Sequence, residues 1–305
     1  MSVKGINRIA IIGTGAVGGY YGAKLAAAGN EVHFLARSDA DVIKAQGLTI
    51  ESLKSDDIHL KDVNVYSNAS DMPICDVVLI TLKTTANKAL SGILKSVVGE
   101  STIICSLQNG YGLEQALEDE FPDNKVLGGL CFICSQKIKP GVIQHQDFGS
   151  IRFAGADDES LQRVVELFTD AGIPTQTSDS LEQARWEKLV WNVPFNGLSV
   201  ILDATTKEML DDPKSRALIH SIMMEVIAAA KAHGCELNDA FAVKLMELTD
   251  GMSPYFPSMK GDFENCRPME IQAIYDSVIQ SAKSKGVAMP QTTMLSQLLS
   301  YMDHG

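Results

Sequence analysis

Long apolar runs are absent from this sequence: no stretch reaches the roughly eighteen apolar residues that a membrane-spanning helix needs. The apolar residues near the N-terminus fit a short strand instead, so neither a membrane span nor a signal peptide is predicted. Positive charge is also scarce, since 26 Lys and Arg are outnumbered by 38 Asp and Glu, for a formal net charge of −12. This balance disfavours general binding to nucleic acid or to an anionic membrane.

Clustered metal ligands are lacking as well. The six cysteines lie mostly in apolar stretches, which is typical of reduced, packed thiols in a cytoplasmic protein. Cys131 and Cys134 form a C-x-x-C pair, but on a strand their side chains would point to opposite faces, so we expect no metal or redox site. No histidine lies in a glycine-rich, amide-rich or kinked stretch, and no Ser-His-Asp elbow occurs. Histidine acid–base catalysis is therefore disfavoured.

A glycine-rich turn near the N-terminus, Gly13-Thr14-Gly15-Ala16-Val17-Gly18, carries the strongest signal. A short apolar strand pattern (residues 8–12) precedes it, and a helical pattern (residues 16–28) follows it. In this context G-x-G-x-x-G indicates a dinucleotide-binding fingerprint, in which the helix N-terminus and the glycine backbone approach a pyrophosphate. An ordinary glycine turn is the alternative.

Arg37 follows the next predicted strand (residues 31–36), where NAD-preferring proteins usually carry an acidic residue for the ribose 2′-hydroxyl. An arginine can instead hold a 2′-phosphate through charge-assisted hydrogen bonds. Asp39 and Asp41 come too late in the loop to be first choices for the ribose. The sequence therefore predicts NADP(H), with a solvated surface arginine as the alternative.

Further strand patterns indicate that a parallel sheet continues along the chain, with a hairpin predicted to form an antiparallel edge. The strands are expected at residues 76–81, 102–107, 126–134 and 174–177, short strands at 48–50 and 58–60, the hairpin at 141–145 and 150–154, and a helix at 159–171. Lys83 and Asn109 follow two of these strands, and the carboxyl ends of such strands line the ligand crevice. Both are candidates to contact cofactor or substrate; a solvated lysine and an Asn-Gly turn are the alternatives.

The chain is too long for one typical core, because single cores rarely exceed about 250–300 residues. Strand patterns nearly vanish after Ser180, where helical periodicity takes over at residues 216–233, 239–249, 270–285 and 291–302. We therefore predict an α/β dinucleotide-binding domain over residues 1–179 and an all-helical domain over residues 180–305. No internal repeat or low-complexity segment is present.

Within the helical domain, Lys188, Asn192 and Asn196 recur every fourth residue, so on a helix they share one face. Their neighbours are apolar, which places this polar face on a largely buried helix where a bound polar ligand could satisfy it. Pro194 should kink the helix and free the carbonyl of Val190. The alternative is a polar face that is simply hydrated.

Several short segments occur in an ordered series along the chain. They are residues 13–19, Leu35-Ala36-Arg37, Thr81-Leu82-Lys83, Gln108-Asn109-Gly110, the Lys188/Asn192/Asn196 series, Pro257–Asp262 and Arg267–Ile271. Through them the chain resembles the ketopantoate reductases (2-dehydropantoate 2-reductases) over nearly its full length. The resemblance implies a Rossmann-type N-terminal domain and an all-α C-terminal domain like that of 6-phosphogluconate dehydrogenase. It also implies NADPH-dependent reduction of 2-dehydropantoate to pantoate, in pantothenate and coenzyme A biosynthesis.

The resemblance also implies roles for single residues. Lys188 is similar to the proton donor, and Glu270 to the carboxylate beside the cofactor and the lysine. Asn109 is similar to an amide that contacts both nicotinamide and substrate. Substrate-holding groups correspond to Asn192, Asn196 and Ser258. NADPH contacts correspond to Gly13, Thr14, Gly15, Ala16, Val17, Gly18, Arg37 and Lys83.

The chain departs from the family pattern at Pro257-Ser258, where two serines are common, and at Met269–Gln272, where Thr-Glu-Ile-Asp is common. Trp191 and Phe195 also make the lysine helix bulkier. A related NADP-dependent reductase of another branched 2-oxo acid therefore remains an alternative, as does a non-catalytic NADP(H)-sensing protein. The expected partner is a small 2-oxo acid, and a homodimer remains open.

Overall fold

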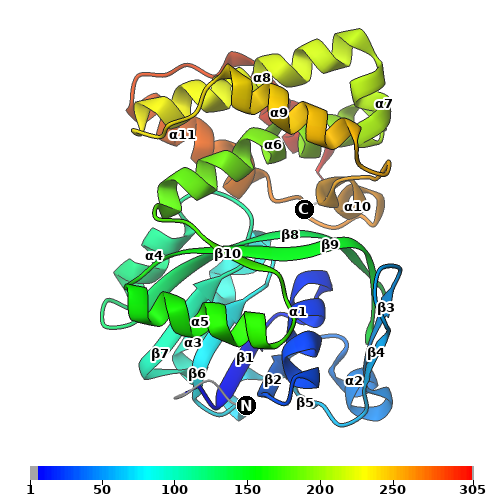
Figure 1. Cartoon of the computed structure of the whole chain (residues 1–305), viewed down its shortest axis with the longest axis vertical. Coiled ribbons are helices and arrows are strands. Elements are labelled where there is room, and N and C mark those ends of the chain that lie inside the picture. Colours follow the sequence, from blue (N-terminus) through cyan, green and yellow to red (C-terminus); the bar gives the residue numbers. More distant parts are fainter. Residues whose placement is uncertain (1–5, 304–305) are drawn as a thin grey trace. The chain divides into compact units, whose positions relative to one another are not determined.

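The structure, a computed structural model, describes residues 6–303. Its contacts define two compact units, which Figure 1 shows as a sheet with its helices and a group of helices. Of the described residues, the first unit contains 6–108 and 113–181, and the second contains 109–112 and 182–303. Within residues 6–303, no helix combines the length and the apolar character that crossing a membrane requires.

The first unit is built on a ten-stranded sheet whose central part is parallel. Six parallel strands lie in the order β5-β2-β1-β6-β7-β8. If these six are numbered by their order in the chain, the sheet has the order 3-2-1-4-5-6 of doubly wound dinucleotide-binding folds. The bounds of the six strands are β1 (Arg8–Ile12), β2 (Glu31–Leu35), β5 (Asn64–Tyr66), β6 (Cys75–Ile80), β7 (Val98–Ser106) and β8 (Lys125–Lys139).

The sheet continues beyond β8 through an antiparallel strand. The added strands are β9 (Val142–Gly155), β3 (Leu48–Ser52), β4 (Ile58–Leu60) and β10 (Thr175–Thr177), of which β3 and β10 both pair with β9 in parallel. The predicted hairpin within residues 141–154 is therefore wrong, since this segment is one strand of a β8–β9 hairpin, and it does not form the sheet edge. Phe148 and Gly149 have positive φ values of 60° and 117°, so the apparent turn is a bulge where the register shifts.

Both faces of this sheet are covered, because neighbouring strand residues alternate between two apolar clusters. Ile9 and Ile11 lie in one cluster, and Ala10 and Ile12 lie in the other. The first cluster includes residues of α1 (Ala16–Ala27) and α5 (Asp158–Asp170), and the second includes residues of α3 (Leu90–Val97) and α4 (Leu113–Glu120). Shorter elements are α2 (Ala40–Gln46), η1 (Ala69–Asp71) and η2 (Thr84–Ala89).

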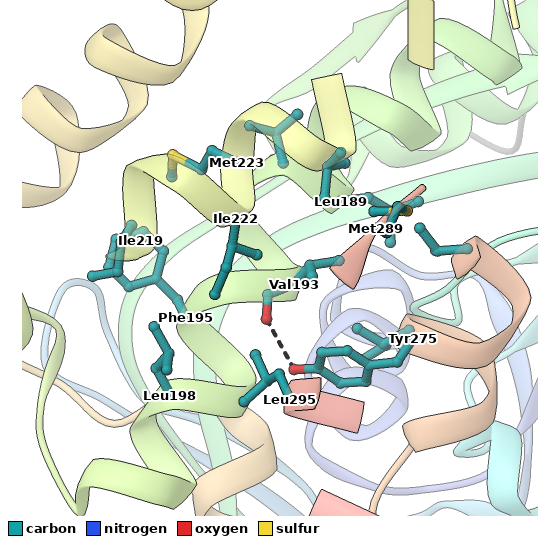
Figure 2. Packing of buried hydrophobic residues seen from close by; sticks show 14 of the residues in the cluster. Leu189, Val193, Phe195, Leu198, Ile219, Ile222, Met223, Tyr275, Met289 and Leu295 are labelled. Atoms are coloured by element: carbon teal, nitrogen blue, oxygen red, sulfur yellow. Dashed lines mark hydrogen bonds between the residues drawn. The ribbon is translucent and has the colours of Figure 1, made fainter. Parts of the chain in front are cut away.

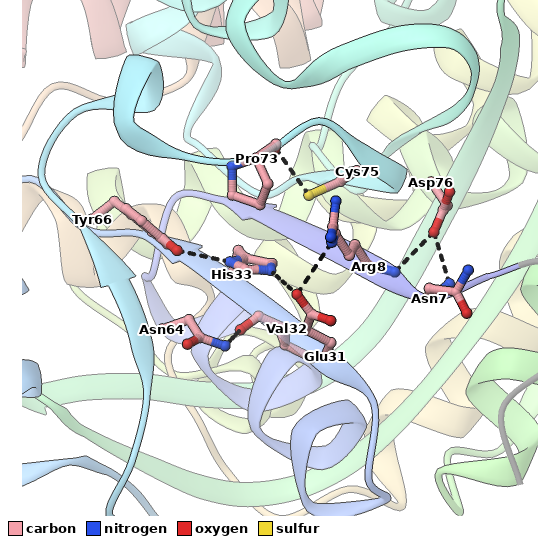
Figure 3. Close-up of polar contacts among 10 residues, drawn as sticks. All are labelled: Asn7, Arg8, Glu31, Val32, His33, Asn64, Tyr66, Pro73, Cys75 and Asp76. Carbon is pink, nitrogen blue, oxygen red and sulfur yellow. Dashed lines mark hydrogen bonds and ion pairs between the residues drawn. The ribbon is translucent and has the colours of Figure 1, made fainter.

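A polar cluster of one buried and three more exposed side chains joins three strands of this sheet, β1, β2 and β5 (Figure 3). The buried His33 contacts the hydroxyl of Tyr66 through Nδ1 at 3.0 Å and the carboxylate of Glu31 through Nε2 at 2.9 Å. Arg8 Nε donates to the same carboxylate at 3.3 Å. The hydrogen bond from His33 is the main reason why the pKa of Glu31 is lowered. The cluster thus fixes β2, the strand that leads to Arg37, between β1 and β5.

The regular elements of the second unit are all helices within its described residues. Its elements are α6 (Leu181–Leu202), α7 (Thr206–Asp211), α8 (Pro213–Ala232), α9 (Asp239–Asp250), α10 (Ser258–Glu264), η3 (Gln272–Asp276), α11 (Ser277–Ser284) and α12 (Pro290–Met302). Helix α6 supplies Trp186, Val193 and Phe195 to the core of this unit. The predicted helix over 270–285 is present, but η3, its first complete turn, is π-helical. The predicted α/β unit with a second, helical unit is confirmed.

Candidate active site

The glycine turn between β1 and α1 has the backbone geometry that the fingerprint requires. Gly13 has a φ of +108°, which favours glycine. A Cβ on Gly18 would lie 2.2 Å from the carbonyl oxygen of Gly13, so only glycine permits this close packing. A Cβ on Gly15 would meet no heavy atom within 4 Å, which leaves open space above the start of the helix. Such space is what a phosphate group needs to approach the backbone.

The side chains around the turn leave the start of α1 uncapped. Thr14 donates through both its backbone N–H (3.1 Å) and its Oγ1 (3.0 Å) to the carbonyl of Leu35, so its hydroxyl is turned away from the helix. Thr81 Oγ1 donates to the carbonyl of Gly13 at 2.7 Å and holds the turn from β6. In the described chain, α1 has no side-chain cap. Its first N–H groups can therefore serve a bound anion.

The loop after β2 presents one cation and holds one carboxylate in place. Arg37 is exposed and forms no ion pair within residues 6–303. Asp39 is buried and accepts from Lys137 Nζ at 2.7 Å and from Ser38 Oγ at 2.8 Å. Burial opposes ionisation of Asp39, but these hydrogen bonds outweigh it and lower its pKa. The carboxylate is thus engaged inside the unit, while the guanidinium is exposed; Lys83, exposed at the start of η2, supplies a second cation after β6.

In the helical unit, α6 carries three of the predicted site residues on one face. Lys188 is half-buried, whereas Asn192 and Asn196 are buried. Asn196 Nδ2 donates to the carbonyl of Asn192 at 3.1 Å, and its Oδ1 accepts from Ser258 Oγ at 3.4 Å and from the N–H of Met259 at 3.3 Å. Asn196 therefore connects α6 to the start of α10 and brings Ser258 beside it.

Trp191 and Phe195, the bulky side chains of this helix, pack against each other. Their rings stack with centroids 4.7 Å apart, and Phe195 is fully buried in the core. Trp191 is half-buried and its Nε1 donates to Thr249 Oγ1 at 3.0 Å. These contacts attach α6 to α9, so part of the extra bulk serves to pack the helix.

Tyr275 is hydrogen-bonded to the backbone of α6 beside Pro194 (Figure 2). Pro194 lies inside the helix, and the hydroxyl of the fully buried Tyr275 donates to the carbonyl of Val193 at 2.9 Å. Burial raises the pKa of Tyr275, while the N–H of Gly197 acts in the opposite direction, so the hydroxyl stays a donor. The hydroxyl therefore lies against the backbone of α6 at Val193 and Gly197.

The π-helical segment η3 also binds the loop that contains Asn109. Glu270 is buried two residues before this segment, and its carbonyl accepts from the N–H of Ile274 at 3.1 Å. The carbonyl of Ala273 accepts from the N–H of Tyr111 at 3.1 Å. Gly110 has a φ of +125°, and a Cβ there would lie 2.6 Å from the Cβ of Ala273. A π-turn leaves carbonyls for outside partners, and in proteins generally it is frequent at functional sites.

Residues 273–275 of η3 are thus hydrogen-bonded to all three segments that carry Asn109, Lys188 and Glu270. A further hydrogen bond joins Asn196 to Ser258. The glycine turn, Arg37 and Lys83 lie together on the carboxyl ends of parallel strands in the first unit. The sequence reasoning missed Tyr111, Thr81 and Tyr275 as supporting residues. An aromatic directly after Asn109-Gly110 was the visible signal for the first of them.

Comparison with known proteins places these observations in one family. The model for "Ketopantoate reductase PanE/ApbA" matches residues 9–158, and the model for its C-terminal part matches residues 180–303. A 2-dehydropantoate 2-reductase of Nostoc sp. is 42% identical over 97% of this chain and 95% of its own length. A crystal structure of 2-dehydropantoate 2-reductase from Geobacter metallireducens GS-15 superimposes with a TM-score of 0.93 at 40% identity, covering 96% of this chain and 99% of that one.

A second similar structure, 2-dehydropantoate 2-reductase from Methylococcus capsulatus, has a TM-score of 0.87 at 32% identity and covers 97% of this chain and 96% of that one. The fold and the matched segments define an oxidoreductase built from a dinucleotide-binding sheet and a helical unit. This chain belongs to the ketopantoate reductase family. The family predicted from the sequence motifs is therefore confirmed.

Proposed function

We propose that this chain reduces 2-dehydropantoate to pantoate with NADPH, and that Lys188 donates the proton. The observation that carries the proposal is the convergence on η3 of the segments bearing Asn109, Lys188 and Glu270. Family membership and 42% identity to a 2-dehydropantoate 2-reductase support the substrate. We further propose residues 1–179 as the cofactor domain and 180–305 as the catalytic domain, acting in pantothenate and coenzyme A biosynthesis in the cytoplasm.

The residues of the first unit fit a phosphorylated dinucleotide. The open space at Gly15 and the uncapped start of α1 suit the pyrophosphate. Gly13, Thr14, Ala16, Val17 and Gly18 would shape that turn, the exposed Arg37 would hold the 2′-phosphate, and Lys83 would be a further contact to the cofactor. Asp39 is held by Lys137, so its carboxylate is engaged away from a ribose 2′-hydroxyl. These features favour NADPH over NADH.

The helical unit supplies groups suited to the reduction of a ketone. NADPH, when bound, supplies the hydride. Negative charge then develops on the carbonyl oxygen, where the Lys188 ammonium stabilises the charge and donates a proton. The carboxylate of Glu270 would keep this ammonium charged in a buried site. Asn109 would contact both the nicotinamide and the substrate, and Asn192, Asn196 and Ser258 would hold the carboxylate and distal hydroxyl.

The test is steady-state turnover of a panel of 2-oxo acids with NADPH and NADH side by side. We expect 2-dehydropantoate with NADPH to be preferred, and Lys188→Ala to lose at least about a hundredfold in kcat, the usual contribution of a general acid. Brisk turnover of another branched acid with negligible turnover of 2-dehydropantoate would favour the related reductase. A chain that binds NADPH but reduces none of the acids would favour an NADP(H) sensor. A loss below about fivefold in Lys188→Ala would reject the lysine as donor.

A homodimer is the assembly we propose, since a ketopantoate reductase from Staphylococcus aureus that shares the fold is described as dimeric. Light scattering coupled to gel filtration decides between a monomer and a dimer.

A further inference from the structure

The loop Asn109–Gly112 is held by a second set of contacts beyond those to η3. Tyr111 donates its hydroxyl to Glu182 Oε1 at 2.7 Å, while its N–H donates to the carbonyl of Ala273 at 3.1 Å. One residue is therefore bound at both its backbone and its side-chain end. By its contacts this loop groups with the helices, although the chain enters it from β7 and leaves it into α4.

Glu182 is itself held firmly at the start of α6. The same oxygen, Oε1, accepts from Trp186 Nε1 at 2.8 Å, and His233 Nδ1 lies 3.4 Å from it. The ring of Trp186 packs on that of Tyr111 with centroids 4.9 Å apart. Partial burial and the neighbouring Glu182 raise the pKa of Tyr111 to about 12, so its hydroxyl remains a donor throughout the physiological range.

We infer that Tyr111 is a positioning residue: bound to Glu182, it fixes Asn109 relative to the helix that carries Lys188. This inference rests on the proposed function, because Asn109 matters only if it contacts substrate and cofactor. Glu182 lies six positions before Lys188 on the same helix. The hydrogen bond from the Tyr111 hydroxyl therefore connects the loop directly to the helix of the proposed proton donor. Small errors in the placement of a reacting group lower the rate strongly, by up to about a hundredfold for 1 Å.

Tyr111→Phe tests the inference, because it removes the hydroxyl and keeps the ring. We expect kcat for the oxo acid to fall about tenfold, in line with a modest misplacement, while the Kd for NADPH stays within about twofold. Tyr21→Phe is the matched control, since it removes one hydroxyl that donates to a backbone carbonyl, that of Ser150, at 3.1 Å in the other unit. The control should lower the unfolding temperature comparably and leave kcat near the wild-type value.

Glu182 provides a second, independent arm. Glu182→Ala should reproduce the loss in kcat, and Glu182→Gln, whose amide oxygen still accepts from Tyr111, should restore most of it. The double variant of Tyr111→Phe with Glu182→Ala should be no slower than Glu182→Ala alone, because the two substitutions remove the same hydrogen bond. Additive losses, or equal losses in the two Glu182 variants, would overturn the inference.

Hydrogen exchange separates this inference from the proposed function. In Tyr111→Phe the amides of residues 109–112 should exchange faster than in the wild type, whatever the chain reduces. Absence of 2-dehydropantoate turnover in the wild type would refute the proposed function alone. Two results would refute the positioning role. In one, the amides of residues 109–112 exchange in Tyr111→Phe at the wild-type rate. In the other, they exchange faster while kcat for the substrate that the panel identifies is unchanged.

Discussion

Gly197 in α6 offers a sharp test of how the helix accommodates Tyr275. A Cβ at this position would lie 2.6 Å from the hydroxyl oxygen of Tyr275 and 2.8 Å from Cδ2 of Leu295. Gly197→Ala should therefore displace the hydroxyl from Val193 and crowd the core. An unsatisfied buried hydroxyl costs about 1–3 kcal/mol and overpacking a similar amount, whereas alanine gains about 0.5–1 kcal/mol in helix propensity. The expected net loss is therefore about 1–5 kcal/mol.

The assay is urea unfolding followed by tryptophan fluorescence, because both tryptophans of the chain lie on α6 and report on the helical unit. Gly261→Ala is the control within the same unit: its Cβ would meet nothing within 4 Å, so we expect no loss, or a gain of up to about 1 kcal/mol. In a Tyr275→Phe background the cost of Gly197→Ala should shrink, since the shortest contact is gone. If Gly197→Ala loses no more unfolding free energy than the control, the hydroxyl of Tyr275 is not the reason why position 197 requires glycine.

Three further predictions concern the first unit. Arg37→Ala should weaken NADPH binding by about 1.5–3 kcal/mol and leave NADH nearly unchanged in fluorescence titrations; equal losses would show that this residue does not contact the 2′-phosphate. Gly15→Ala should retain stability yet impair dinucleotide binding, whereas Gly18→Ala, with a Cβ 2.2 Å from backbone, should lose about 3 kcal/mol, and the reverse ranking in thermal unfolding would contradict the turn geometry. Lys137→Met should cost about 1.5–3 kcal/mol at neutral pH. Because the pKa of Asp39 is lowered on folding, that cost should be complete above its ordinary value of 3.8 and fade in more acidic urea titrations; a cost independent of pH would refute the pairing.

Much of the fold could be predicted from local pattern alone. Buried parallel strands such as Asp76–Thr81 show as continuous β-branched runs, and glycines at 13, 15 and 18 between a strand and a helix are typical of a dinucleotide-binding turn. The hairpin at residues 141–154 failed for a physical reason. Asp147-Phe148-Gly149 carries turn residues, yet pairing with the long β8 makes it a bulge within one strand. Pairing of this kind depends on residues distant in the sequence.

The candidate site divides in the same way. Lys188, Asn192 and Asn196 could be grouped from helical spacing, because their relation is local. The bonds from Tyr275 to Val193 and from Tyr111 to Ala273 link positions far apart in the chain, and the π-turn that makes Ala273 available has no periodicity of its own in the sequence. Only the folded unit reveals which residues support those that the motifs name.

The excursion of residues 109–112 into the helical unit constrains how the protein can be made and cut. During synthesis this loop emerges long before Glu182 and Ala273, so its anchors do not exist until most of the chain has left the ribosome. A fragment ending near residue 180 would retain the sheet but lose every partner that holds Tyr111. The two halves of the polypeptide are therefore unsuited to exchange as independent modules, because the loop at residues 109–112 of the first half is held by contacts with residues of the second half.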